Sequence, residues 1–303
     1  MEGVAIAFVC DEGYVMQTAV AITSVIRNKA AESNYDIYII GTGLSDSSVE
    51  TFLSMRGRGV EISVIQAEID AELYKQKNAE SIYLVATKAA LLKFEIPRIL
   101  RREKVLYLDG DIIVMGDLSE LFSVDLGDSY AAVVRDLPQV LFDVPLIDVG
   151  IGRDYFNSGV MLLNLKQLRV ENVREKLVDE KRRRSNDTLM DQNVLNIVFK
   201  DRVLQLPMKY NVLYANLRRS WKEPGVVERL NQLYGTSYRA AQDLRRDAVV
   251  VHYSSKDKPW KYFDAPMAKQ WMEVYRRSPY RDIPLRRKCL LMQRIRNKIK
   301  QVV

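Results

Sequence analysis

The sequence predicts an α/β protein in which helices flank a mixed, mostly parallel central sheet. Short apolar segments that are typical of buried strands alternate with segments of helical spacing in the N-terminal part of the chain. Such alternation favours a sheet of the doubly wound kind. The length of 303 residues allows one large domain with an appendage, or two small domains.

The first strand and helix are expected at residues 4–10 and 17–27. Residues 4–10 are a continuous apolar run, and the polar residues Asp11, Glu12 and Tyr14 follow it as a loop. Within residues 17–27, apolar side chains recur at helical spacing. Strand, loop and helix therefore make a βα unit.

The next elements continue this alternation. Strands are expected at residues 35–40 and 60–65, where β-favouring residues cluster, with a helix at 46–55 between them. Another helix is expected at 86–97 and should end near Pro97. This half of the chain is typical of a nucleotide-binding module.

A buried strand that begins at Lys104 is interrupted by two carboxylates, Asp109 and Asp111, on either side of Gly110. A central strand should carry no uncompensated charge. Side chains two residues apart on an extended chain point to the same face, so both carboxylates can reach one hard cation, and Gly110 lets a ligand approach the backbone. We therefore expect a metal site at a strand end, where open α/β sheets bind their ligands.

Polar residues also follow later strands. Three further elements are expected downstream: a short helix at 118–122, a strand at 130–134 that leads into Asp136, and a charged helix at 166–184. In residues 155–165, Asn157 and Ser158 enter an apolar strand, where a buried amide serves either as a core hydrogen bonder or to bind the hydroxyl groups of a ligand. Asn164 is expected to bond local backbone groups.

His252 is the only histidine in the protein, and it follows an apolar run. In this setting a histidine is either a hydrogen-bonded core residue or a metal ligand. Two polar segments precede it: residues 187–196, which include Asp191 and Gln192, and residues 206–211.

These segments, in this order, resemble glycosyltransferase family 8, the retaining, nucleotide-sugar-dependent group that contains bacterial lipopolysaccharide hexosyltransferases and glycogenin. The matching segments are YLDGDIIV (107–114), FNSGVMLLNL (156–165), DTLMDQNVLN (187–196), LPMKYN (206–211) and HYSSKDKPW (252–260). Haloacid-dehalogenase-type phosphatases also place Asp-X-Asp after an apolar strand, but they need a later acidic pair, and this chain contains no Asp-Asp.

The resemblance implies a GT-A-type catalytic domain at residues 1–280. A nucleotide-binding half would span about 1–115, and a half for the donor sugar and the acceptor would span about 116–280. The segment 206–211 would shape the acceptor side.

The resemblance also implies roles for individual residues. A Mn²⁺ site, with Mg²⁺ as the alternative ion, is implied at Asp109, Asp111 and His252, and catalytic contacts are implied for Asp136, Asp191 and Gln192. Contacts to the nucleotide sugar are implied for Cys10, Asp11, Tyr14, Lys93, Leu108, Gly110, Asn157, Ser158, Ser255 and Lys258.

Four positions depart from the family's residues. Lys93 stands in place of an arginine, Gly13 in place of an asparagine, Ser255 in place of a glycine, and Asn193 in place of an acid. Lysine keeps the charge of arginine but not its bidentate geometry. A solvated lysine on a helix face is the alternative interpretation of Lys93.

The expected function is a metal-dependent hexosyltransferase that moves glucose or galactose from a UDP-sugar to a cell-surface glycan or a lipid-linked saccharide. A protein or peptidyl-glycan glucosyltransferase of the same family is one alternative. A protein that binds nucleotide sugars without turning them over is an alternative of another class.

The net charge of +7 arises in the C-terminal segment, since residues 281–303 hold eight Lys or Arg against one acidic residue. The remainder sums to zero, so no nucleic-acid-binding surface is expected. Cys10 and Cys289 lie far apart, which favours a reducing compartment over a disulfide framework. No apolar window approaches the ~18 residues that span a bilayer, and a cytoplasmic protein is expected.

Residues 285–303 interleave basic side chains with apolar ones at Leu291, Met292, Ile295, Ile299 and Val302. This spacing places the apolar side chains along one stripe of a helix. We expect this basic amphipathic tail to bind an anionic membrane surface and to hold the enzyme at the inner face of the cell membrane. A helix packed on the catalytic domain and a disordered basic end are the alternatives.

Overall fold

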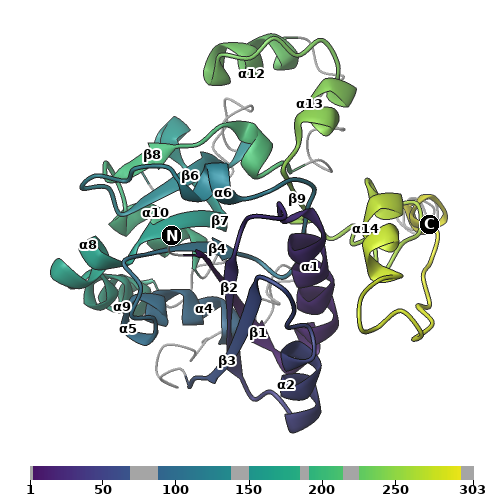
Figure 1. Ribbon diagram of the computed structural model, residues 1–303. Coiled ribbons are helices and arrows are strands. Elements are labelled where there is room, and N and C mark those ends of the chain that lie inside the picture. The colour runs from purple at the N-terminus through teal and green to yellow at the C-terminus, as the bar shows by residue number, and fades with distance from the viewer. Residues whose placement is uncertain (1–2, 69–87, 138–149, 185–190, 214–224, 295–303) are drawn as a thin grey trace, which may run out of the picture.

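A computed structural model of the protein describes residues 3–68, 88–137, 150–184, 191–213 and 225–294. The described chain forms a seven-stranded sheet in the order β3-β2-β1-β4-β7-β6-β8 (Figure 1). Its strands are β1 (Val4–Asp11), β2 (Tyr35–Thr42), β3 (Val60–Gln66), β4 (Lys104–Leu108), β6 (Ala131–Arg135), β7 (Phe156–Asn164) and β8 (Val203–Gln205).

The sheet is mixed and mostly parallel, as predicted. Strands β3, β2, β1 and β4 run parallel to one another, whereas β7 runs antiparallel to both β4 and β6, and β8 is parallel to β6. The antiparallel strand β7 lies inside the sheet, between β4 and β6. It carries the segment that contains Asn157 and Ser158 to a position beside the carboxyl end of β4.

A second, two-stranded sheet decides where the functional residues meet. After Leu108 the chain leaves the main sheet, and β5 (Ile112–Val114) pairs antiparallel with β9 (Val250–His252). Ile112 is the partner of His252 in this pairing. The strand that begins at Lys104 is interrupted at the two carboxylates, as predicted, and the chain continues in the second sheet. The two carboxylates therefore occupy the crossing between two sheets.

Helices cover both faces of the main sheet. They are α1 (Val15–Asn28), α2 (Asp46–Leu53), α4 (Lys88–Leu91), α5 (Ile96–Ile99), α6 (Ser119–Phe122), α8 (Leu165–Val170), α9 (Val173–Arg183), α10 (Gln192–Val198), α12 (Val226–Tyr234), α13 (Ala241–Asp247) and α14 (Ala268–Tyr275). Four short 3₁₀ segments join them: η1 (Glu12–Tyr14), η2 (Leu92–Glu95), η3 (Gly152–Asp154) and η4 (Met208–Tyr210).

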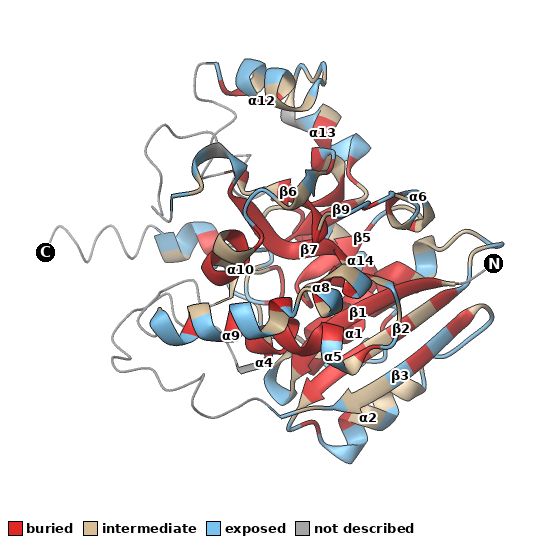
Figure 2. Cartoon of the chain, turned by 90° about the vertical axis from the view of Figure 1, so that its left-hand side faces the viewer, coloured by how far each residue is buried: buried red, intermediate tan, exposed pale blue. Residues whose placement is uncertain are grey.

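Strand β1 shows why both faces need cover. Its even-numbered residues, such as Ile6 and Phe8, pack in a cluster with α1, whereas Ala5 and Ala7 pack in a second cluster with residues of α4, α8 and α9. Alternate side chains of a strand point to opposite faces, so an all-apolar strand is stable only between two layers of helices. Strands β1, β4, β6 and β7 accordingly form the buried centre of the molecule, whereas the edge strand β3 is partly exposed (Figure 2).

Two predicted helix boundaries differ from the structure. Pro97 does not end the helix expected at 86–97; it lies in the first turn of α5, where a missing N–H breaks no helical hydrogen bond. The charged helix expected at 166–184 is two helices, α8 and α9, because Asn172 adopts a left-handed conformation (φ 50°) between them. Asn164 caps α8 as expected, since its side chain accepts from the N–H of Gln167.

The C-terminal segment is packed on the domain as far as it is described. Lys288 forms backbone hydrogen bonds with Lys261 and Phe263, and the Asp264 carboxylate accepts the backbone N–H groups of Leu290 and Leu291. Residues 285–289 are not helical, so the expected helix from residue 285 is wrong at its start. Ile295, Ile299 and Val302 lie outside the described residues.

No helix in the described ranges is both long enough and apolar enough to cross a bilayer.

Glu95 offers a test of how η2 and α5 are held against α9. This buried carboxylate, between η2 and α5, accepts hydrogen bonds from Arg98 (2.8 Å) and from Arg174 of α9 (2.7 Å). Burial raises the pKa of Glu95, but the hydrogen bonds from Arg174 and Arg98 outweigh burial and hold the pKa below its usual value.

We predict that Glu95→Gln lowers the free energy of unfolding by about 2 kcal/mol at pH 7, because Arg174 loses its buried counter-charge and keeps only the exposed Glu175 as a partner. The folded-state pKa lies below the unfolded value of about 4.3, so this contribution is fully present above pH ~4.3 and disappears as the pH falls through the folded-state pKa. Urea unfolding of both proteins between pH 7 and pH 3 measures the difference. Glu103→Gln, which removes an exposed partner of Lys166, is the matched control and should change little. The assignment would be contradicted if the difference in unfolding free energy did not decrease at all between pH 7 and pH 3.

Candidate functional site

Asp109 and Asp111 lie where the chain passes from β4 to β5. The backbone N–H of Asp109 donates to Gly159 of β7 (2.8 Å), and the carbonyl of Asp111 accepts from the N–H of Tyr253 (2.9 Å). These bonds fix both residues against neighbouring strands. Asp111 is buried and Asp109 is partly exposed, so one carboxylate lies inside the protein and solvent reaches the other.

His252, at the end of β9, completes a cluster with these two carboxylates. Its Nε2 lies 3.1 Å from an Asp111 oxygen and 3.8 Å from an Asp109 oxygen. One ligand atom from each of the three residues lies within 4.8 Å of the others. Two carboxylates and one imidazole form a donor set that suits a divalent ion such as Mn²⁺. The residues that the sequence nominated as metal ligands thus lie together and fit such an ion.

Lys258 supplies positive charge beside this cluster. Its Nζ lies 2.6 Å from Asp111 and donates to the carbonyl of Tyr253, and it lies over the ring of Trp260. Burial raises the pKa of Asp111, but the charge of Lys258, together with His252, outweighs burial and holds the pKa well below its usual value. Asp111 is therefore ionised at neutral pH.

Lys93 is buried on the other side of Asp109. Its Nζ lies 3.1 Å from Asp109 and 2.6 Å from Asp191, and it donates to the Ser158 hydroxyl (3.3 Å). Burial lowers the pKa of Lys93, but the two carboxylates more than compensate and raise it above its ordinary value. The interpretation of Lys93 as a solvated lysine on a helix face is wrong, because the side chain joins the Asp-X-Asp segment to α10.

Amide side chains form a network next to this ion pair. Asn157 Nδ2 lies within hydrogen-bond distance of Gln192 Oε1 (3.1 Å) and Asp136 Oδ2 (3.3 Å), and Gln192 Nε2 donates to Asp136 Oδ2 (3.1 Å). The backbone N–H of Ser158 donates to Gln192 Oε1 (3.1 Å). The three residues expected to make catalytic contacts, Asp136, Asp191 and Gln192, therefore meet at one end of β7.

The loop after β1 borders the cluster through Tyr14. Its ring packs edge-on against Trp260, with ring centres 6.0 Å apart, and burial followed by the charges of Asp111 and Asp109 raises the pKa of its hydroxyl. Asp11 ends β1 and is partly exposed. Cys10 differs, because burial raises the pKa of its thiol to about 12 and its side chain packs in the core. The side chain of Cys10 is therefore not placed to contact a ligand.

Three other predicted contacts are limited by the packing. The side chain of Leu108 is fully buried in the core, so only its backbone can take part in binding. A Cβ on Gly110 would lie 2.5 Å from the Thr18 hydroxyl, so a glycine is needed there for α1 to pack and not for a ligand alone. The Ser255 hydroxyl accepts from the N–H of Asp257 (3.2 Å) and so holds the loop that carries Lys258.

Two buried asparagines belong to the site although the sequence did not single them out. Asn211 contacts His252 and Asn157, and Asn196 pairs with both the N–H and the carbonyl of Phe156. Each lies in one of the two polar segments that precede His252, 187–196 and 206–211, and this position is the signal that could have identified it. Asn193, which stands in place of an acid, accepts from the Tyr155 hydroxyl (2.6 Å) and supports Gln192 indirectly.

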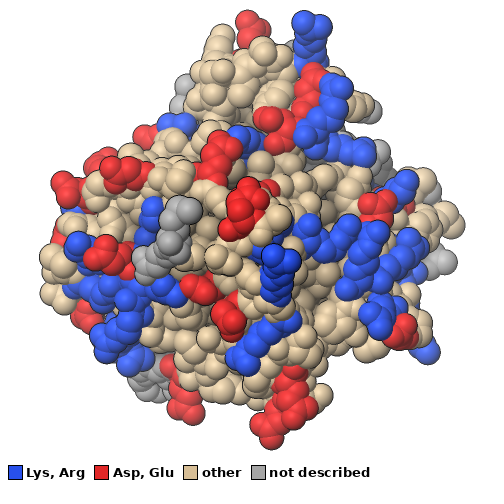
Figure 3. All heavy atoms as spheres, viewed as in Figure 1, with Lys and Arg blue, Asp and Glu red and all other residues tan. Residues whose placement is uncertain are grey.

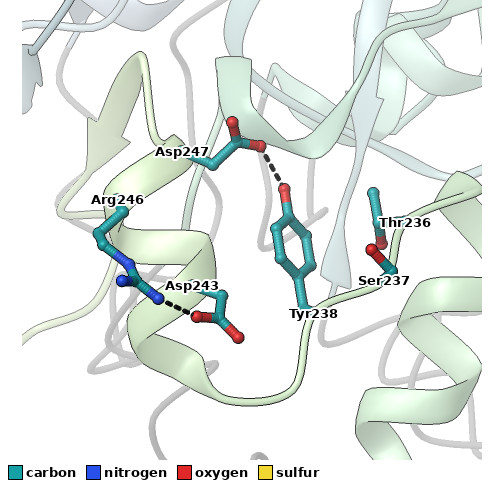
Figure 4. A pocket seen from close by; sticks show the side chains of 6 residues that line it. All are labelled: Thr236, Ser237, Tyr238, Asp243, Arg246 and Asp247. Carbon is teal, nitrogen blue, oxygen red and sulfur yellow. Dashed lines mark hydrogen bonds and ion pairs between the residues drawn. The ribbon is translucent and has the colours of Figure 1, made fainter.

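A shallow hollow of about 450 Å³ lies elsewhere, between the end of α12 and α13 (Figure 4). It is lined by Thr236, Ser237, Tyr238, Asp243, Arg246 and Asp247. Its polar groups pair with each other, Tyr238 with Asp247 and Arg246 with Asp243. None of the residues discussed above lines this hollow, so it is not part of the candidate site.

Comparison with known proteins gives a consistent result. The family model described as glycosyl transferase family 8 matches residues 5–264. The chain is 29% identical over 286 residues to a lipopolysaccharide 1,2-glucosyltransferase of Escherichia coli, which covers 91% of this chain and 79% of that protein. It is 28% identical to the glycosyltransferase GlyE of Streptococcus pneumoniae, over 89% of this chain and 60% of that longer protein.

Solved structures extend the comparison to the fold. A crystal structure of GlyE superposes with a TM-score of 0.67 at 26% identity, over 91% of this chain and 60% of that chain. An active-site mutant of LgtC superposes with a TM-score of 0.73 at 23% identity, over 92% of this chain and 97% of that chain. The fold is therefore the GT-A fold of glycosyltransferases, as predicted.

Gly159 tests the geometry of the cluster. A Cβ on Gly159 would lie 2.2 Å from Cε1 of His252 and 2.8 Å from an Asp109 oxygen. We predict that Gly159→Ala displaces the imidazole and weakens Mn²⁺ binding by about tenfold or more, measured by calorimetry, because side chains that orient metal ligands carry effects of this size.

Gly116→Ala is the control for this prediction, since its Cβ would meet only Val249 at an ordinary 3.6 Å. Circular dichroism of both variants checks that the fold is retained. Equal Mn²⁺ affinity in the folded Gly159→Ala protein would show that the ring position does not control the site.

Proposed function

The chain belongs to glycosyltransferase family 8, and on this premise we propose that it transfers a hexose, glucose or galactose, from a UDP-sugar with retention of anomeric configuration. The convergence of Asp109, Asp111, His252 and Lys258 beside the amide network carries the proposal. The acidic pair with His252 and Lys258 suits a metal-bound diphosphate, and the adjoining amide network suits a sugar.

In the transfer reaction the nucleoside diphosphate is the leaving group. The negative charge that develops on it is the main contribution to the activation barrier. A divalent ion held by Asp109, Asp111 and His252, Mn²⁺ or Mg²⁺, would act as a Lewis acid toward the diphosphate oxygens. We assign to Lys258 a second positive charge at the same place, where one preorganised contact is typically worth ~3 kcal/mol in the transition state. Tyr14 and Trp260 wall this position with apolar surface, which lowers the local dielectric and strengthens the charge interactions.

The donor hexose would lie against Asp136, Asn157 and Gln192. Carboxylate and amide groups recognise sugar hydroxyls by directional hydrogen bonds. Gln192 is held at both ends of its amide, by Asn157 and Ser158 at the oxygen and by Asp136 at the nitrogen. A carboxamide is a weak nucleophile. We therefore assign to Gln192 the positioning of the hexose.

Asp191 lies next to this pocket but is engaged differently. Its carboxylate forms an ion pair with Lys93 and accepts from the Ser158 hydroxyl (3.0 Å). Lys93 also contacts Asp109, so this one buried cation pairs both with a carboxylate of the proposed metal site and with a carboxylate next to the proposed sugar pocket. We propose that Lys93 holds the two carboxylates in register and that Asp191 contacts the donor sugar.

We propose a saccharide or glycolipid as the acceptor, because a lipopolysaccharide glucosyltransferase is among the relatives. A protein or peptidyl-glycan acceptor is the alternative within the family. A non-catalytic nucleotide-sugar binder is disfavoured, because the acidic pair, His252, Lys258 and Gln192 are all present and assembled.

We further propose that the C-terminal segment attaches the enzyme to an anionic membrane at the cytoplasmic face. Phe263, Ile283, Leu291 and Met292 are each more than half exposed. Lys and Arg side chains gather over the region of α14 and the C-terminal segment (Figure 3). Apolar side chains can enter the headgroup region while each basic residue adds about 1 kcal/mol of attraction.

The first experiment tests the donor and the metal together. Among UDP-, GDP- and CMP-sugars, we expect Mn²⁺-dependent release of the nucleotide from UDP-glucose or UDP-galactose, and loss of this activity by at least about 100-fold in Asp111→Asn, since the carboxylate charge is lost from the site. Calorimetry of UDP binding with Mn²⁺ or with EDTA gives an independent readout. A response to only GDP- or CMP-sugars, or equal UDP affinity in EDTA, would contradict the proposal.

The second experiment tests the membrane contact. Co-sedimentation with vesicles that contain anionic lipid should be strong for the wild type, should weaken with salt, and should fall in the double variant Leu291→Ser, Met292→Ser. Val170→Ser, at an exposed apolar residue of α8, is the matched control. UDP-sugar hydrolysis should persist in all variants. Unchanged sedimentation of the double variant would rule out this attachment.

A further inference from the structure

Asn211 lies directly behind the imidazole of His252. Asn211 follows η4 and is 1% exposed. Its neighbour Val212 exchanges backbone hydrogen bonds with β9. The N–H of Val212 donates to the carbonyl of Val250 (2.9 Å), and the N–H of His252 donates to the carbonyl of Val212 (3.0 Å). This pairing brings Asn211 Oδ1 to 3.1 Å from His252 Nδ1. The contact is thus built by the backbone and not by chance side-chain packing.

The orientation of the Asn211 amide follows from a backbone donor. The N–H of Gly159 donates to Asn157 Oδ1 (3.1 Å), so this atom is an acceptor. Asn211 Nδ2 donates to the same oxygen (2.9 Å), which turns Asn211 Oδ1 toward the imidazole. An amide oxygen can only accept, so Nδ1 of His252 must carry a proton.

This proton assignment leaves Nε2 of the neutral imidazole without hydrogen. Nε2 is the atom that faces Asp111 (3.1 Å) and Asp109 (3.8 Å). A histidine ligand is commonly oriented in this way by a partner on its other nitrogen. The close approach of Gly159 to Cε1 closes the space on another side of the ring.

The hydrogen bonds of Asn211 extend to the residues that we propose bind the donor sugar. Asn157, which takes the Asn211 hydrogen bond on its oxygen, uses its nitrogen to contact Gln192 (3.1 Å) and Asp136 (3.3 Å). One chain of hydrogen bonds therefore runs from His252 through Asn211 and Asn157 to Gln192. A change in the position of one end alters the hydrogen bonds available at the other.

We propose that Asn211 is a positioning residue with two effects: it fixes the tautomer of His252, and it couples metal binding to recognition of the donor sugar through Asn157. The inference rests on the proposed metal and donor sites. By linkage, an amide that holds both ends makes metal and sugar strengthen each other's binding by the same factor.

The single histidine makes the tautomer directly measurable. Nitrogen-15 spectra of protein labelled at histidine, recorded with Zn²⁺ and UDP as a diamagnetic complex, should show a proton on Nδ1 and none on Nε2. The opposite tautomer would overturn the proposal in the wild-type protein, without any variant.

Two substitutions separate the two effects. Asn211→Leu has similar volume but no hydrogen bonds, and should weaken Mn²⁺ binding by about 10- to 100-fold in calorimetry. Asn211→Asp keeps an acceptor for Nδ1 but loses the donor to Asn157. It should therefore bind Mn²⁺ and UDP nearly as the wild type does, yet lose the extra affinity that UDP-hexose has over UDP.

Asn28→Leu is the control, because Asn28 makes comparable amide bonds to the carbonyls of Ser24 and Val114 (both 3.0 Å) with no contact to the cluster. It should lower stability and leave Mn²⁺ affinity unchanged. If the wild type binds Mn²⁺ but folded Asn211→Leu binds it equally well, this inference fails while the proposed function stands. If the wild type binds neither Mn²⁺ nor UDP, the proposed function itself fails.

Discussion

Compensation of two carboxylates at the end of β4 is the constraint on which the rest of the site depends. Asp111 is buried and Asp109 is only partly exposed, so neither charge is fully hydrated. The compensating groups come from distant parts of the chain: Lys93 precedes β4, and His252 and Lys258 follow β9. The pairing of β5 with β9 is what brings the last two within reach. A fold that separated these strands would leave an uncompensated charge inside the protein.

Close packing turns this charge cluster into a defined site. Gly159 allows β7 to touch the imidazole, and Gly110 allows α1 to approach the crossing between the two sheets. The amides of Asn157, Asn211 and Gln192 then fill the space between metal ligands and sugar pocket. Their hydrogen-bond partners are each other, backbone groups, and the side chains of Asp136, Tyr155 and His252. Such networks are rigid because each unmade hydrogen bond in a buried position is costly. Rigidity of this kind is what preorganised electrostatic catalysis requires.

The peripheral elements are held by weaker means. Apolar side chains form the core around the cluster, whereas polar contacts tie down the C-terminal segment: the backbone of Lys288 pairs with Lys261 and Phe263, Asp264 accepts from Leu290 and Leu291, and Arg294 forms an ion pair with Asp257. The exposed apolar residues of this segment are not buried against the domain, so they contribute no hydrophobic stabilisation to it. The C-terminal segment is thus attached to the domain and still exposes apolar and basic side chains to solvent. Such a segment is suited to bind the surface of another partner.

The sequence by itself predicted the first strands and helices, the mostly parallel sheet and the acidic pair, because apolar periodicity and interrupting charges are local properties of the chain. His252 and Lys258 were assigned to the site by the resemblance to the family, and α12, α13 and α14 were not predicted. The sequence did not reveal that the chain changes sheets after Leu108, that Pro97 lies in the first turn of a helix, or that Asn211 holds the imidazole. Those features were decided by contacts between residues far apart in the chain. Whether a polar side chain is solvated or becomes a partner of a ligand, as for Lys93 and Asn211, depends on which strand packs over it, and only the tertiary structure supplies that neighbour.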